Sequence, residues 1–183
     1  MRTQLVYRKA ARQKGATLVI ALLVLVLIMM IGITAVSTSN TQYKLAGNLQ
    51  FEDGAMNNAE AAVSKAENWL GIGTNYQSAG FFTYDASNSP QLYPIGSSAA
   101  MVTSPLTTSW SDSNSISVGG SSQRYQIQLL STNNLLTGSS AALGRQAAAV
   151  CNKVNTYLIT GRGVTNRGAT KFVQSYYSVL SCT

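Results

Sequence analysis

The sequence predicts an α+β chain in which a long N-terminal helix packs on a small antiparallel β-sheet. Two observations lead to this prediction. Residues 16–43 contain no Asp, Glu, Lys or Arg, and the centre of this run is almost purely aliphatic. The last third of the chain contains segments in which apolar and polar residues alternate, which is the period of a half-buried strand.

The uncharged run, residues 16–43, is long enough to cross a membrane as a helix. A bilayer core of roughly 30 Å needs about 20 apolar residues in a helix. Five basic residues and no acidic residue precede Ala16, and the next basic residue is Lys44. This one-sided distribution predicts a cytoplasmic N-terminus, a single span of a membrane and a C-terminal head on its far side.

Residues 1–15 have the composition of a leader peptide. They are basic and end in Gly15, directly before the apolar run, whereas an ordinary secretory signal is cut beyond its apolar core. Glycine has no side chain, so it leaves the backbone accessible to a peptidase at the membrane surface. This pattern fits cleavage between Gly15 and Ala16, which would keep the apolar helix in the mature protein, and it fits an uncleaved single-pass anchor equally well.

The charge balance also depends on these first residues. The whole chain has a formal net charge of +7, but residues 16–183 carry only eight basic and six acidic residues. The basic character belongs mostly to the leader, so a nucleic-acid partner is not expected.

A helical period continues through residues 44–70 and predicts an amphipathic stem helix. Its apolar residues recur at spacings near three or four. They are Leu45, Leu49, Met56, Ala59, Val63 and Leu70. Gly71 follows the last periodic residue and predicts the end of the helix.

Residues 71–183 are expected to form the head. The part up to about residue 122 is rich in Ser, Asn, Gly and Thr and holds all three prolines, which predicts a loop with short elements at most. Strands are expected at residues 125–130, 155–164 and 171–180, with a turn at residues 165–168 joining the last two.

Six aromatic residues are scattered through the predicted loop. We expect them to pin the loop onto the core, and the alternative is a surface that binds a sugar or a protein partner. They are Tyr76, Phe81, Phe82, Tyr84, Tyr93 and Trp110.

Residues typical of catalytic and cofactor sites are scarce. The chain has no histidine, which excludes a Ser-His-Asp triad and a histidine metal site. The short motif at residues 161–163, Gly-Arg-Gly, lacks the Lys-Ser/Thr of a phosphate-binding loop. Neither an enzyme activity nor a cofactor or metal is therefore expected.

The N-terminal region resembles a known family. Beside the basic leader ending in Gly15, the chain carries Ala-Gly-Asn at residues 46–48 and Ala-Glu-Ala-Ala at residues 59–62. Over roughly the first 70 residues this combination resembles type IV prepilins, and most of all the PilX family of minor pilins. The resemblance implies a type IV pilin-like fold, cleavage by a prepilin peptidase and N-methylation of Ala16. It also implies a helix that is first a membrane anchor and later part of a filament core.

One position departs from the major pilins, which usually carry Glu as the fifth residue of the mature chain. Here that position is Ile20, and no acidic residue occurs before Glu52. A carboxylate in hydrocarbon needs a partner, so a subunit without it does not pair in this way with the amine of a neighbouring subunit. PilX-like pilins share this lack, which implies a position at or near the filament tip.

The implied role is assembly of the type IV pilus, and hence adhesion or twitching motility. The implied partners are other minor and major pilins, the prepilin peptidase and a tip adhesin. The protein would reside first in the inner membrane and then outside the cell in the pilus. Two alternatives remain open: a type II secretion pseudopilin, and a single-pass periplasmic binding protein that never enters a filament.

The two cysteines, Cys151 and Cys182, fit an oxidising compartment. A bond between them would close a loop of about 30 residues and stabilise the head by roughly 3 to 4 kcal/mol. The alternative is two reduced, buried thiols. A C-terminal disulfide also resembles the one that frames a variable region in many pilins.

Overall fold

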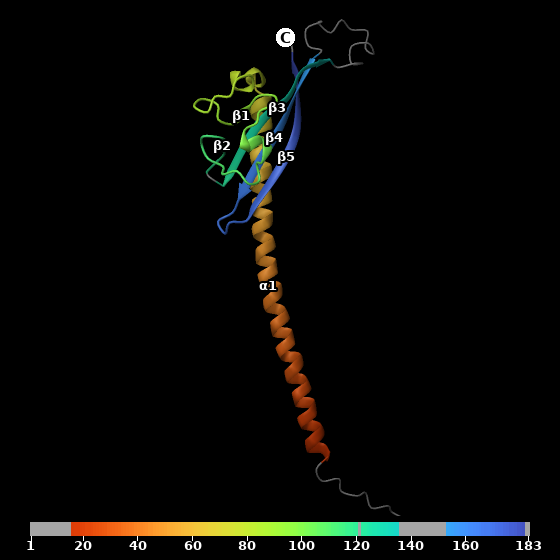
Figure 1. Ribbon diagram of the computed structural model, residues 1–183. Coiled ribbons are helices and arrows are strands. Elements are labelled where there is room, and N and C mark those ends of the chain that lie inside the picture. Colours follow the sequence, from red (N-terminus) through yellow and green to blue (C-terminus); the bar gives the residue numbers. More distant parts are fainter. Residues whose placement is uncertain (1–15, 121, 136–152, 182–183) are drawn as a thin grey trace, which may run out of the picture. The chain divides into compact units, whose positions relative to one another are not determined.

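The computed structural model describes residues 16–120, 122–135 and 153–181, and it divides into two units within the first helix (Figure 1). One unit is residues 1–47 and the other is residues 48–183. The elements are α1 (Ala16–Leu70), the 3₁₀ turns η1 (Asn75–Gln77) and η2 (Ala79–Phe81), β1 (Leu92–Tyr93), α2 (Ala100–Thr103), β2 (Ile116–Ser117), β3 (Gln123–Leu135), β4 (Lys153–Val164) and β5 (Thr170–Ser181).

Helix α1 confirms both the expected helix and its end. The segment contains no proline, and the good helix formers Ala and Leu recur throughout it. At the C-terminus, the backbone N–H of Gly71 donates to the carbonyl oxygen of Glu67 at 3.0 Å. Gly73 then adopts a positive φ of 55°, a conformation that glycine reaches without strain and that turns the chain away.

The strands β3, β4 and β5 form the antiparallel part of the sheet, where the sequence places them. Each is longer than expected, and β4 lies between the other two. The predicted turn between β4 and β5 is also confirmed. The N–H of Thr165 donates to the oxygen of Ala169 at 3.0 Å, and Gly168 supplies a φ of 83°.

The loop before β3 adds two short strands that the sequence does not reveal. Both β1 and β2 pair with β3, and β1 runs parallel to it, with Leu92 opposite Ile127. The sheet is therefore mostly antiparallel, not wholly so as expected. A parallel pair requires a long return connection, and the residues between β1 and β3 provide one.

The stem part of α1, residues 48–70, packs on one face of the sheet through small residues. Ala55 and Ala59 are fully buried, and they face Gly161 and Gly163 of β4. A Cβ built on Gly161 would lie 2.6 Å from the carbonyl oxygen of Ala59, and one on Gly163 would overlap the oxygen of Ala55. The two glycines therefore allow the helix backbone to approach the strand closely.

This contact corrects the predicted apolar stripe of the stem. Ala59, Val63 and Leu70 are buried as expected, but Leu49 and Met56 are 51% and 39% exposed. The buried face runs instead through Ala55, Ala59, Ala62, Val63, Ala66 and Leu70. Larger side chains at Ala55 and Ala59 would not fit against the glycines, so at these two positions small size matters more than hydrophobicity.

Aromatic residues of the loop extend this core, as expected for most of them. The Phe81 ring lies 4.9 Å from that of Tyr157 in β4, and Tyr93 is buried. The Tyr157 hydroxyl donates to the carbonyl oxygen of Tyr76 at 2.5 Å, and burial raises the pKa of Tyr157 to about 12. Phe82 and Tyr84 are exposed, at 62% and 38%, although the Tyr84 ring stacks on that of Tyr93.

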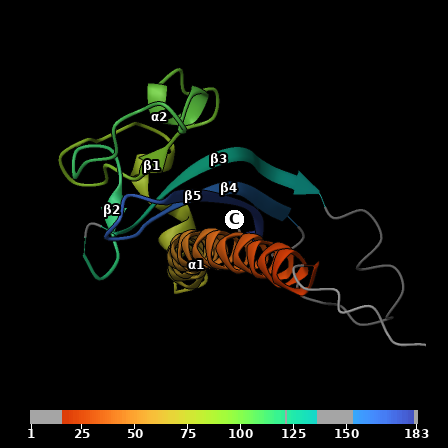
Figure 2. The same cartoon turned by 90° about the horizontal axis from the view of Figure 1, so that it is seen from below.

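The opposite face of the sheet, called the outer face below, is partly covered by the loop. Figure 2 shows the stem of α1 on one side of the strands and α2 on the other. The side-chain amide of Gln126, on the outer face of β3, donates to the carbonyl oxygen of Met101 at 2.7 Å. This buried hydrogen bond holds α2 against the sheet.

Candidate functional site

Residues 18–36 carry a surface that is apolar on every side. The 15 large hydrophobic side chains from Leu18 to Val36 are all exposed, from 42% at Val26 to 71% at Ile33. One 18-residue window of α1 has a mean hydropathy of 3.1. A helix that is hydrophobic all round belongs in an apolar environment, either a protein core or a membrane.

One face of this segment is shaped as a shallow groove. It has a volume of about 370 Å³ and only apolar lining residues, at the spacing of one helix face. They are Val19, Leu22, Leu23, Val26, Leu27 and Met30. Ridges of side chains on a second helix fit into grooves of this kind.

The polar residues that follow the groove are satisfied within the helix. Thr34 donates its hydroxyl to the oxygen of Met30 at 3.1 Å, and Thr38 donates to the oxygen of Thr34 at 2.9 Å. Thr41 repeats the pattern with the oxygen of Ser37 at 3.0 Å. Because their hydroxyl donors are already paired, these residues are compatible with surroundings that contain little water.

The structure describes only some of the N-terminal residues that the sequence points to. Gly15 lies outside the described residues, and Ala16 is the first residue of α1. Ile20 is 61% exposed among aliphatic neighbours, and the first turn of the helix holds no acidic residue. Cleavage and N-methylation at Ala16 therefore remain predictions.

Cys151 and Cys182 also lie outside the described residues, so their bond remains a prediction. The described strand ends next to the two cysteines lie opposite each other in the sheet. Lys153 and Ser181 are partners in the β4–β5 register, and each stands within two residues of one cysteine in the sequence.

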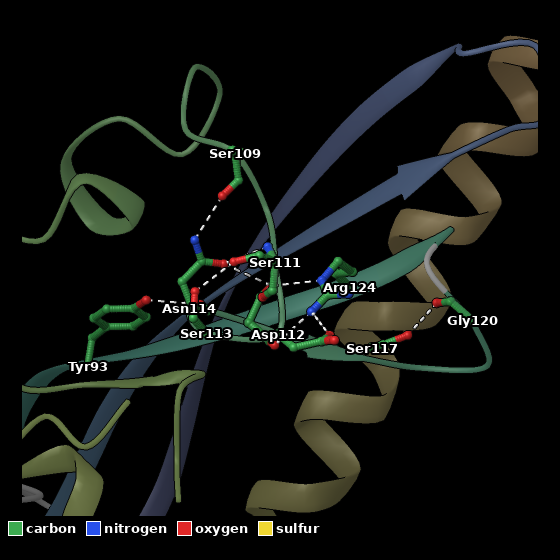
Figure 3. Close-up of polar contacts among 10 residues, drawn as sticks. Tyr93, Ser109, Ser111, Asp112, Ser113, Asn114, Ser117, Gly120 and Arg124 are labelled. Atoms are coloured by element: carbon green, nitrogen blue, oxygen red, sulfur yellow. Dashed lines mark hydrogen bonds and ion pairs between the residues drawn. The ribbon is translucent and has the colours of Figure 1, made fainter. Parts of the chain in front are cut away.

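The most elaborate polar cluster of the head surrounds Arg124 of β3, which the sequence did not single out (Figure 3). Arg124 is only 6% exposed. Its guanidinium donates to the Ser115 hydroxyl at 2.8 Å, to the Ser115 carbonyl oxygen at 3.0 Å and to the Asp112 carboxylate at 2.6 Å. Every partner lies in the segment before β2, so the buried charge fixes that segment onto the strand.

Asn114 organises the same loop from its other side. Its side-chain amide donates to the oxygen of Ser109 at 2.8 Å, while its side-chain oxygen accepts from the N–H of Ser111 at 2.9 Å. Tyr93 donates to the carbonyl oxygen of Asn114 at 2.9 Å, as Figure 3 shows. These contacts give the cluster a structural role, because its strong donors and acceptors are directed at one another.

Three side-chain contacts connect the stem of α1 to strand β5 and to the turn before it. Lys171 forms an exposed ion pair with Glu52 at 3.0 Å, and the Arg167 guanidinium lies 4.8 Å from the centre of the Phe51 ring. Ser175 donates to the Glu67 carboxylate at 2.7 Å. These contacts join the hairpin to the stem.

No family model, curated protein or solved structure matches the chain. The architecture is nevertheless specific, because a long apolar N-terminal helix continues into a stem that packs on a mostly antiparallel sheet. This arrangement is consistent with a pilin-like fold. By length and composition, α1 can cross a membrane once, and an N-terminal signal sequence has the same property.

Proposed function

We propose that the chain is a minor pilin of the type IV pilus, resembling the PilX family, made as an inner-membrane precursor and cleaved after Gly15. One observation carries the proposal. The apolar helix is continuous with the stem that builds the core of the head, so the same element serves the membrane and the fold. A signal sequence that is removed would not need this continuity.

In the proposed mechanism, the apolar helix moves from the lipid bilayer into the helical core of a filament. In the bilayer, the aliphatic side chains between Leu18 and Val36 contact lipid. In a filament the same surface contacts the helices of other pilins, and the groove that runs from Val19 to Met30 receives one of them. Because Thr34, Thr38 and Thr41 are paired internally, the exchange leaves these three hydroxyl donors paired.

The proposal places the subunit at or near the filament tip, in a complex with other minor pilins that starts assembly and presents an adhesin. Support comes from Ile20, which has no carboxylate to offer to the amine of a neighbouring subunit. A subunit of this kind is tolerated where no such pairing is required.

The test is the intact mass and N-terminal sequence of the protein from membranes with and without an active prepilin peptidase. We expect a chain beginning at Ala16, and N-methylated, only when the peptidase is active. Gly15→Leu should abolish cleavage, whereas Gly32→Ala, inside the helix with open space around it, should leave cleavage intact. A chain that keeps residues 1–15 in every case contradicts the proposal.

The tip position is tested by restoring the missing carboxylate. Ile20→Glu should raise the amount of this chain relative to the major pilin in sheared filaments, because the subunit gains the pairing used along the shaft. Val24→Glu, one helical turn further on, is the matched control and should not raise it. An equal effect of both changes, or of neither, contradicts the assignment.

A membrane-anchored periplasmic binding protein is the second candidate, favoured by a cavity of about 600 Å³ in the head. A protein of this kind stays in the membrane fraction when filaments are sheared from cells. A type II secretion pseudopilin is separated by deleting the pilus assembly motor, which should not affect its assembly. Recovery in sheared pili that requires this motor supports the minor pilin alone.

A further inference from the structure

The cavity lies on the outer face of the sheet, between residues 102–107 and the strands β4 and β5. Its floor consists of Thr160, Phe172 and Gln174. Thr160 and Gln174 are direct partners in the β4–β5 register, and the Gln174 amide donates to the Thr160 hydroxyl oxygen at 3.1 Å. The floor is therefore built on two paired strands, which hold its side chains in fixed positions.

An aromatic pair fixes the wall against this floor. The Trp110 ring lies 5.9 Å from that of Phe172, at a tilt of 46°. The Trp110 indole N–H donates to the carbonyl oxygen of Pro105, a lining residue, at 2.9 Å. The loop that closes the cavity is thus attached to the floor through Trp110.

The lining combines an aromatic face with uncharged polar groups. Five of the nine lining residues carry a hydroxyl or an amide, and none carries a charge. The polar lining residues are Thr103, Ser104, Thr107, Thr160 and Gln174. Thr103 and Thr107 already donate to backbone oxygens of the same loop, but hydroxyl and amide oxygens keep the capacity to accept, so the lining matches a ligand rich in hydroxyl donors.

We propose that this cavity binds a neutral sugar unit of a glycan. The C–H face of a sugar ring packs on Phe172, while its hydroxyl groups exchange hydrogen bonds with Gln174 and with the exposed Ser104. The volume lies in the range of pockets that hold small ligands. A charged ligand is disfavoured because no lining residue would compensate its charge after desolvation.

A buried glutamine lies beside the floor without lining the cavity. Gln126 is the β3 partner of Thr160 in the register and is 3% exposed. Its side-chain oxygen has no hydrogen-bond partner among the residues that the structure describes. Because Gln126 does not line the cavity and its amide donates to Met101, this residue positions the segment that carries the wall and does not contact the ligand.

The experiment uses the full chain in lipid nanodiscs and isothermal titration calorimetry with lactose, maltose and N,N′-diacetylchitobiose. We expect saturable binding of at least one of these neutral disaccharides, with a Kd on the order of millimolar. Phe172→Leu, which keeps an apolar side chain, should weaken that binding about tenfold. Gln174→Ala should weaken it about fivefold, whereas the matched change Gln128→Ala, outside the cavity on the same face, should not.

Thermal unfolding of each variant shows whether the head remains folded.

Two further probes test the alternative ligands, an acidic sugar and a peptide. Sialyllactose tests an acidic sugar, since Arg162 is the β4 partner of Phe172 although it does not line the cavity. Binding stronger than that of lactose and lost in Arg162→Gln overturns the neutral assignment. A proline-rich peptide tests a protein ligand, and saturable binding of that peptide alone, or of no probe, overturns the proposal.

Discussion

The two parts of helix α1 obtain their apolar surroundings in opposite ways. Residues 16–47 carry large aliphatic side chains that remain exposed on every side of the helix. Residues 48–70 instead bury one face, and the residues of that face are mostly alanine. The first part depends on something outside the chain to cover it, whereas the second is covered by the chain's own sheet.

The difference shows how one helix can serve two purposes. Small residues bring the stem within backbone contact of Gly161 and Gly163, which gives a fixed geometry but little tolerance of change. Large aliphatic residues give no fixed partner, so their surface can contact lipid or another helix equally well. We therefore expect substitutions in the stem to affect folding and those in residues 16–47 to affect location.

The largest effect is expected at Gly163, where the stem and the sheet meet. Gly163→Ala should destabilise the head by about 4 kcal/mol or more, because the new Cβ would overlap the backbone of α1. Gly47→Ala is the matched control. Nothing lies within 4 Å of a Cβ at that position, so the helix should gain up to about 1 kcal/mol.

Both glycine variants can be compared by chemical denaturation of the full chain in detergent, with near-ultraviolet circular dichroism reporting the head. A stable head in Gly163→Ala would show that the close approach of helix and strand is not required. A loss of head stability in Gly47→Ala would show that the two parts of α1 are not independent.

The next effect is expected from the cysteines, which belong to the head alone. Replacing Cys151 and Cys182 by Ser should lower the free energy of unfolding by roughly 3 kcal/mol and leave the membrane association of residues 16–47 unchanged. Thiol alkylation before and after reduction is the direct measurement. Two thiols that react without reductant would disprove the bond and predict no loss of stability.

A lysine substitution should disfavour membrane insertion in the first part of α1 and have little effect in the stem. Leu25→Lys places an ammonium group at the centre of the apolar run, which disfavours membrane insertion by about 3 kcal/mol. Met56→Lys places the same group on the exposed side of the stem and should have little effect. Extraction of membranes at alkaline pH should release the first variant and retain the second, and release of both would contradict the assigned span.

The sequence was sufficient for the elements that depend on local pattern. The uncharged run, the end of α1 at Leu70 and the strands β3, β4 and β5 each follow from periodicity or from a glycine signal. It was insufficient where the partner lies far along the chain. The alternation in β4 identifies a strand, but nothing local shows that Gly161 and Gly163 face the alanines of the stem.

Only part of the candidate site could be predicted from the sequence. Composition alone identified the apolar surface of residues 16–47, since a surface that covers all sides of a helix needs no knowledge of its orientation. The Arg124 cluster and the cavity over Phe172 were not predicted, because both depend on how the loop folds over the sheet. A polar loop with short elements carries almost no periodic signal for that arrangement.

The smallest effect is expected at the end of the β4–β5 hairpin, where contacts with the stem are exposed. Lys171→Ala removes the ion pair with Glu52 and should lower head stability by less than about 1 kcal/mol, with the loss shrinking as salt is added. Arg167→Ala removes the contact with Phe51 and should cost about 0.5 to 1 kcal/mol. Denaturation at low and high salt checks both values. A loss comparable to that of Gly163→Ala would mean that the hairpin, and not the close contact of alanine and glycine, holds the head on its stem.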